Sequence, residues 1–99
     1  MSEQATVTVK DNPDESRYEA WDDSGVVAGF AQYKLRDGHV IFTHTEVDDA
    51  FEGRGVGSTL VRAALDDVRG RGLQVRPVCP FFKSYIEQHP EYEDLLVAS

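Results

Sequence analysis

FEGRGVGSTL, residues 51–60, lies between a predicted strand and a predicted helix. Gly53, Gly55 and Gly57 alternate with other residues, and Arg54 adds a positive charge among them. The first four amides of a helix have no partner within that helix, and together with the helix dipole they attract anions. The stretch therefore predicts a binding site for a phosphate or pyrophosphate. The alternative is a glycine turn that only lets a strand and a helix pass closely.

Two known phosphate-binding motifs do not fit this stretch. A Walker loop ends in Gly-Lys-Ser or Gly-Lys-Thr, and residues 51–60 contain no lysine. A dinucleotide fingerprint needs a third glycine, but the frame from Gly53 ends at Ser58 and the frame from Gly55 ends at Leu60. The predicted anion site therefore depends on the helix start itself rather than on either motif.

A helix is predicted directly after the glycines, and Gly70 and Gly72 mark its end. Its apolar residues recur at helical spacing, at Val56, Leu60, Val61, Ala64, Leu65 and Val68. Pro80 occupies the favoured first position of a second, shorter helix, which Pro90 ends. The inward side of that helix is predicted to consist of Phe82, Tyr85, Ile86 and His89.

Five strands are predicted, at residues 5–10, 17–21, 26–36, 39–47 and 73–78. Asp37-Gly38 is typical of a two-residue type I′ hairpin. That turn predicts the pairs Leu35 with Val40, Tyr33 with Phe42 and Ala31 with His44, so that His44 and then Glu46 continue an apolar sheet face. Because a strand-helix-strand crossover is right-handed, the fifth strand should run parallel to the fourth. We therefore predict an α/β fold with a mixed, mainly antiparallel five-stranded sheet and two principal helices.

Length and composition limit the class of protein. The 99 residues predict a single domain, 1–99, in which residues 1–4 form a flexible tail. No apolar run approaches the roughly 20 residues of a membrane span, and the first residues do not resemble a secretory signal. Cys79 is the only cysteine, which excludes an internal disulfide and a cysteine-rich zinc site. These features predict a cytoplasmic protein without a bound metal.

The net charge of −8 argues against nucleic acids and anionic membranes as partners. The arginines are nevertheless concentrated in one region, at Arg54, Arg62, Arg69, Arg71 and Arg76. A locally basic region in an acidic chain could bind a small polyanion. The alternative is that these arginines form a solvated helix face.

The segments HTEV, GRGVGSTLV and CPFFKSYIEQHPEY, in this order, resemble the small stand-alone GNAT-like proteins, N-acetyltransferase-domain-containing proteins of YjdJ type. The resemblance covers roughly residues 5–95. The loop of GNAT acyltransferases is usually written [Q/R]-x-x-G-x-[G/A], and residues 52–57 match its two small positions. Glu52 departs from the pattern, because glutamine or arginine is usual there. The resemblance implies the GNAT-like acyl-CoA N-acyltransferase fold and acetyl-CoA as co-substrate.

The resemblance also implies where coenzyme A would bind. Its pyrophosphate would rest on the amides of residues 54–58, that is Arg54, Gly55, Val56, Gly57 and Ser58. The pantetheine arm would run between the fourth and fifth strands and end near Glu46 and Val47. Lys83 and Ser84 could hold the nucleotide end.

Acyl transfer to an amine needs a base, and histidine exchanges a proton readily near neutral pH, so His44 is a candidate general base. The alternative is a histidine that finishes a sheet face. Glu46 could act as the base instead, or be an exposed carboxylate. Cys79 lies before a helix N-terminus and could be an acyl-accepting nucleophile, a general acid or a buried small residue. Tyr85 could protonate the leaving thiolate, as a tyrosine does in many GNAT enzymes, or belong to the core.

These features predict an acetyl-CoA-dependent N-acetyltransferase. Only a turn follows the first strand, where GNAT enzymes have two helices, so the acceptor site should be open. An open site suits a primary amine on a protein, peptide or polyamine. The alternatives are a CoA or acyl-CoA binding or sensing module with little transferase activity, and a plain interaction domain. We expect a monomer or weak dimer.

Overall fold

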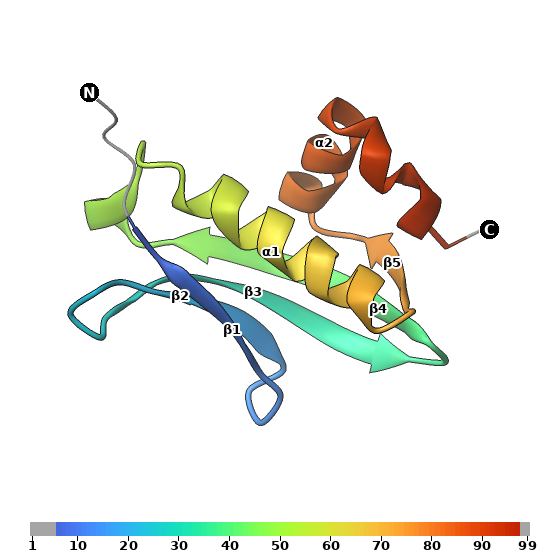
Figure 1. The fold of residues 1–99 in the computed structure, drawn as a ribbon, viewed down its shortest axis with the longest axis horizontal. Helices are drawn as coiled ribbons and strands as arrows, with labels where there is room; N and C mark the ends of the chain where they lie inside the picture. Colours follow the sequence, from blue (N-terminus) through green and yellow to red (C-terminus); the bar gives the residue numbers. More distant parts are fainter. Residues whose placement is uncertain (1–5, 98–99) are drawn as a thin grey trace.

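The computed structural model describes residues 6–97. The strands are β1 (Thr8–Asn12), β2 (Arg17–Trp21), β3 (Val27–Arg36), β4 (His39–Val47) and β5 (Gln74–Pro77). The helices are α1 (Val56–Gly70) and α2 (Pro80–Gln88), and two short 3₁₀-helices are η1 (Asp49–Phe51) and η2 (Pro90–Leu95). The sheet has the order β1-β2-β3-β4-β5. Among the five strands of the described residues only β4 and β5 pair in parallel, so the predicted mixed sheet is confirmed (Figure 1).

The first strand differs most from its predicted range. Its predicted start at Ala5 lies outside the described residues, and the strand continues to Asn12, where a turn was predicted. The turn follows instead at residues 13–16, where Ser16 adopts a positive φ of 53°. The fifth strand is shorter than its predicted range 73–78, because it pairs with β4 only over Gln74–Pro77.

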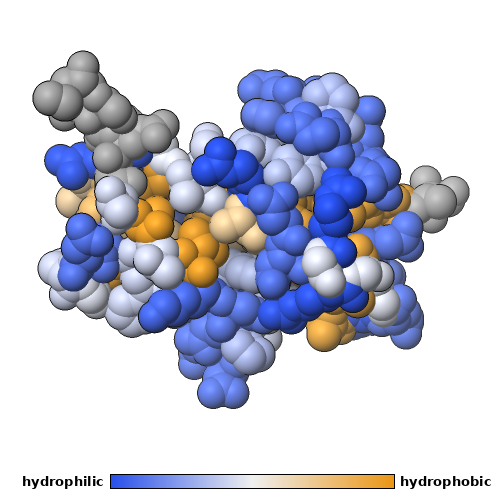
Figure 2. Space-filling model, viewed as in Figure 1, coloured by the Kyte–Doolittle hydropathy of each residue, from blue (hydrophilic) through white to orange (hydrophobic). Residues whose placement is uncertain are grey.

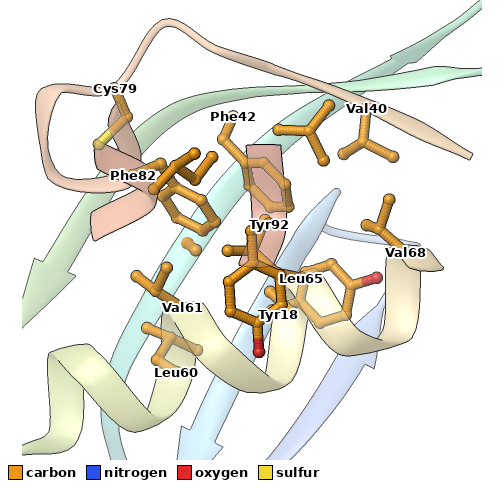
Figure 3. Packing of buried hydrophobic residues seen from close by; sticks show 14 of the residues in the cluster. Tyr18, Val40, Phe42, Leu60, Val61, Leu65, Val68, Cys79, Phe82 and Tyr92 are labelled. Carbon is orange, nitrogen blue, oxygen red and sulfur yellow. The ribbon is translucent and has the colours of Figure 1, made fainter. Parts of the chain in front are cut away.

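Both helices pack on one face of the sheet (Figure 1). Every apolar position predicted for α1 is buried: Val56, Leu60, Val61, Ala64, Leu65 and Val68. Phe42 of β4 and Phe82 of α2 stack with their ring centroids 3.9 Å apart and join the sheet to the second helix (Figure 3). The opposite face of the sheet carries no helix in the described part of the chain, and we call it the outer face.

A β-bulge in β4 changes which of its residues face the helices. The predicted pairs of Leu35 with Val40 and of Tyr33 with Phe42 are confirmed. The next pair is Gln32 with His44, because β4 contains one extra residue after Phe42. The predicted pairing of Ala31 with His44 is therefore wrong. A bulge inserts a residue into one strand only, so every side chain beyond it changes sides.

As a result, His44 and Glu46 lie on the outer face and do not continue the face of Phe42. Thr45 and Val47 are turned toward the helices instead, and the Thr45 hydroxyl lies 3.3 Å from the Cys79 sulfur. The outer-face side chains are open to solvent: His44 is 54% exposed and Glu46 is 61% exposed.

Two of the clustered arginines form ion pairs with acidic residues. Arg69 pairs with Asp94 at 2.8 Å, and its guanidinium lies over the Tyr92 ring. Arg71 pairs with Asp11 at 2.9 Å and joins the end of α1 to β1. These two arginines therefore connect the C-terminal end of α1 to η2 and to β1.

Figure 2 shows a largely hydrophilic surface over α2 and the end of α1, with smaller hydrophobic patches beside α1. No helix among residues 6–97 has the length and apolarity that a membrane crossing requires.

Candidate functional site

A cavity of about 320 Å³ lies where the glycine-rich loop meets the end of β4. We call it the glycine cleft. Its lining residues are Thr45, Val47, Glu52, Gly53, Gly55, Val56, Gly57 and Phe81. The predicted loop residues Gly55, Val56 and Gly57 and the predicted strand residue Val47 therefore lie together in one cavity.

The start of α1 is open to a ligand. Its N-cap residue is Gly55, with φ 78°, and no side chain within residues 6–97 caps the helix. The amides of Val56, Gly57 and Ser58 have no hydrogen-bond acceptor among the described residues, and the first turn contains no acidic residue. Asp48 caps the preceding 3₁₀-helix instead, through the Ala50 amide. Three free donors at the positive end of a helix suit an anion.

Gly57 has a specific steric reason to be glycine. Its backbone is helical, so no positive φ requires glycine here. A Cβ atom at this position would, however, lie 2.6 Å from the Phe81 ring. Phe81 itself is 42% exposed, which is unusual for a phenylalanine beside a core. The ring therefore forms a wall of the glycine cleft directly over the first turn of α1.

β4 and β5 separate beside this cleft. They pair from His39 with Gln74 to Phe42 with Pro77, and the Cys79 amide then donates to the Phe42 carbonyl at 2.8 Å. Beyond that bond, residues 43–47 of β4 have no partner in β5. Cys79 is 4% exposed and lies near Phe82 in the core (Figure 3). Its sulfur contacts the hydroxyl of Thr45, which lines the cleft.

His44 and Glu46 form a pair on the outer face. His44 Nε2 lies 3.0 Å from a Glu46 carboxylate oxygen, and the His44 ring packs 6.2 Å from the Phe30 ring. Glu46 lines a second cavity of about 250 Å³, which we call the outer-face pocket. Val47 lines both this pocket and the glycine cleft, so the two cavities meet at the end of β4.

Three predicted residues lie in a shallow groove between α1 and α2. Ser58, Ser84 and Tyr85 line it together with Phe81, which they share with the glycine cleft. Lys83 is on another side of α2, in a cavity lined by β5 and the C-terminal segment. The structure therefore does not bring Lys83 to the loop. Arg54 lies in the loop, is exposed and forms no ion pair with any described residue.

Tyr85 is half-buried and stacks on His89 with ring centroids 3.9 Å apart. Burial raises the pKa of its hydroxyl above the ordinary value, and Arg62 partly opposes that change. His89 is fixed by a 2.8 Å hydrogen bond between Nδ1 and the Tyr85 carbonyl. The Tyr85 ring thus contributes to the packing of α2 and also lines the groove.

Thr45 and Phe81 are site residues that the sequence pattern did not indicate. The bulge leaves no signal in the hydrophobic pattern, so the sequence does not show that Thr45 faces the helices. Phe81 was passed over because Phe82, its neighbour, matches the helical stripe. In the described residues, no group of three or more His, Cys, Asp and Glu side chains is arranged to hold a metal ion.

A family described as GCN5-related N-acetyl-transferase matches this chain over residues 17–95. Curated relatives called Protein NATD1 from human and from Xenopus tropicalis are 40% identical over 47 residues. The match covers 48% of this chain and 42% or 43% of those proteins. The chain thus matches less than half the length of these relatives.

Solved structures agree in fold. A proposed GCN5-like N-acetyltransferase from Staphylococcus aureus is 26% identical with a TM-score of 0.69, over 100% of this chain and 93% of that chain. A proposed acetyltransferase from Deinococcus radiodurans R1 is 28% identical with a TM-score of 0.51. That likeness covers 84% of this chain and 55% of the other.

Proposed function

The chain belongs to the GCN5-related N-acetyltransferase family, and on this basis we propose that it transfers an acetyl group from acetyl-CoA to a primary amine. The observation that carries the proposal is the uncapped start of α1, which opens into a cavity beside separated strands. Those features together match an elongated ligand with an anionic middle.

The residues of the cleft fit coenzyme A. The amides of Val56, Gly57 and Ser58 would hold the pyrophosphate, and Arg54 would add a positive charge. Thr45 and Val47 would line the pantetheine arm, and Ser58, Ser84 and Phe81 the nucleotide end. Glu52 is the exception, because its carboxylate lines the same cavity as the predicted pyrophosphate.

Acetyl-CoA supplies an activated carbonyl carbon, to which the amine nitrogen bonds as the carbon–sulfur bond breaks. The side chains of this protein would manage the protons. His44 accepts the proton that the amine loses, and Glu46 orients the His44 ring through the 3.0 Å contact. The Cys79 thiol, in contact with the Thr45 hydroxyl that lines the cleft, would return a proton to the departing sulfur. In this scheme Cys79 acts as a general acid. The alternative is a covalent acyl-cysteine intermediate, and experiment must distinguish the two routes.

The runner-up is a CoA or acyl-CoA binding module. The same cleft would serve it, because pyrophosphate binding needs only the start of α1. The paired His44 and Glu46 favour the enzyme, since a binding module needs no base beside the end of β4. The acceptor is proposed to enter from the outer face, where β1 leads into β2 through a turn and no helix of the described residues 6–97 closes the site.

Two measurements test the proposal in sequence. Thermal unfolding is followed with CoA at about 100 times its dissociation constant, where a bound ligand stabilises the folded state by about 2.7 kcal/mol. No shift at millimolar CoA would refute both the enzyme and the binding module. Acetyl transfer is then measured with a panel of amines and peptides for wild type and His44→Ala. Binding of CoA without transfer to any acceptor would favour the binding module.

A further inference from the structure

A carboxylate is buried on the outer face of the sheet. Glu19 of β2 is only 4% exposed, although no helix covers this face in the described residues. It accepts hydrogen bonds from Arg17 Nε at 2.7 Å, Trp21 Nε1 at 3.1 Å and Asn12 Nδ2 at 3.2 Å. Burial alone would raise the pKa of Glu19, but these hydrogen bonds together lower it below its ordinary value. Glu19 is therefore a fixed negative charge that positions its neighbours.

Arg17 is the neighbour that Glu19 holds most closely. The Arg17 guanidinium also lies over the Phe30 ring, 4.7 Å from its centroid. Glu19 engages only the Nε–H, so the two terminal amino groups have no acceptor among the described residues. A guanidinium that is fixed on one edge and open on the other is suited to bind a carboxylate.

Arg17 also lines the outer-face pocket. Arg17 and Phe30 line that pocket together with Glu46 and Asp48. The register places Glu19, Phe30 and Glu46 in one row across β2, β3 and β4. Arg17 therefore reaches over the Phe30 ring from β2, and Glu46 lies beside Phe30 on β4. The pocket has a positive and a negative end.

We propose that this pocket binds the acetyl acceptor, and that the acceptor is an amino acid carrying a carboxylate one carbon from its amine. This inference rests on the proposed function. Arg17 binds the carboxylate, Phe30 forms the floor, and Glu46 with His44 receives the ammonium group. A polyamine would leave the terminal amino groups of Arg17 without an acceptor and place a cation against them.

Arg17 and His44 both lie beside the Phe30 ring. The Arg17 guanidinium carbon is 4.7 Å from the Phe30 centroid, and the His44 ring centroid is 6.2 Å from it. The register agrees, because Arg17 and His44 are both paired with Gln32 of β3. Two groups that are close to one aromatic ring suit a small acceptor better than an extended one.

The test uses the twenty common L-amino acids, each compared with its own amide, in which the carboxylate is neutralised. Binding to the isotope-labelled protein is followed by NMR without coenzyme, through the Arg17 Nε–H signal. Acetylation is then followed with acetyl-CoA as kcat/KM. We expect at least one amino acid to bind roughly 10- to 100-fold more tightly than its amide, as for a hydrogen bond between charged groups.

Arg17→Lys keeps the charge and a partner for Glu19, so it should fold, but it loses the planar fork. We expect it to lose most of the preference for acids over amides. Arg36→Lys, at the exposed end of β3, is the matched control and should keep the preference for acids over amides. The inference is overturned if no acid binds more tightly than its amide, or if Arg17→Lys retains the preference. Failure of CoA to bind would refute the proposed function only, because the acids are titrated without it.

Discussion

The substitution Gly57→Ala separates a ligand-binding loop from a mere structural turn. The new Cβ would lie 2.6 Å from the Phe81 ring, so the ring must move by about 1 Å to reach ordinary van der Waals separation. Phe81 is 42% exposed, so this movement costs less than it would for a buried ring. Alanine also favours the helix over glycine by up to about 1 kcal/mol. We expect the free energy of unfolding to stay within about 1 kcal/mol of wild type.

The affinity for CoA should respond more strongly than stability. The methyl group would enter the glycine cleft beside the free amides and obstruct at least one hydrogen bond to the pyrophosphate. Such a bond to a charged group contributes about 1.5–3 kcal/mol, which corresponds to about a 10- to 100-fold loss of affinity. Calorimetric titration with CoA measures this loss, and urea unfolding measures stability.

Gly70→Ala is the matched control, because Gly70 lies at the other end of α1 and a Cβ there meets nothing within 4 Å. It should leave CoA affinity unchanged. If folded Gly57→Ala binds CoA as tightly as wild type, the start of α1 does not hold the pyrophosphate and the reasoning fails.

Four further outcomes follow from the site and the core. His44→Ala should lower acetyl transfer by about 10²- to 10⁴-fold with little change in CoA affinity, and equal turnover would remove His44 from the mechanism. Cys79→Ala should slow transfer without any acetyl group being trapped on wild type; label found on wild type and absent from the variant would instead establish a covalent route. Glu52→Gln should tighten CoA binding by about two- to fivefold at low salt and less at high salt, whereas an unchanged Kd would show that this charge does not face the ligand. Burial and a hydrogen bond to Asp66 raise the pKa of Tyr92 to about 12. The protonated Tyr92 hydroxyl therefore stabilises the folded state fully below about pH 10, and this stabilisation is lost as the pH rises toward 12. The urea midpoints at about pH 9 and about pH 11 should accordingly differ less in Tyr92→Phe than in wild type.

Local patterns were sufficient for most elements of the fold. The apolar stripe from Val56 to Val68 identified α1 because burial on one side of a helix imposes that spacing. Asp37-Gly38 identified the hairpin because both residues need a positive φ, and they adopt 47° and 81°. Strand ends were less accurate, as at Asn12, because a strand ends where its partner ends.

The sequence alone also indicated an anion site at the start of α1, since Gly53, Gly55 and Gly57 carry no side chains that could cover the first amides of the helix. Tertiary structure alone decided which residues of β4 face the cleft, because the bulge after Phe42 is a property of pairing between strands. It likewise placed Phe81 over Gly57 and Arg17 between Glu19 and Phe30. Those contacts join residues that are distant in sequence, and only the packing of separate elements brings their side chains together.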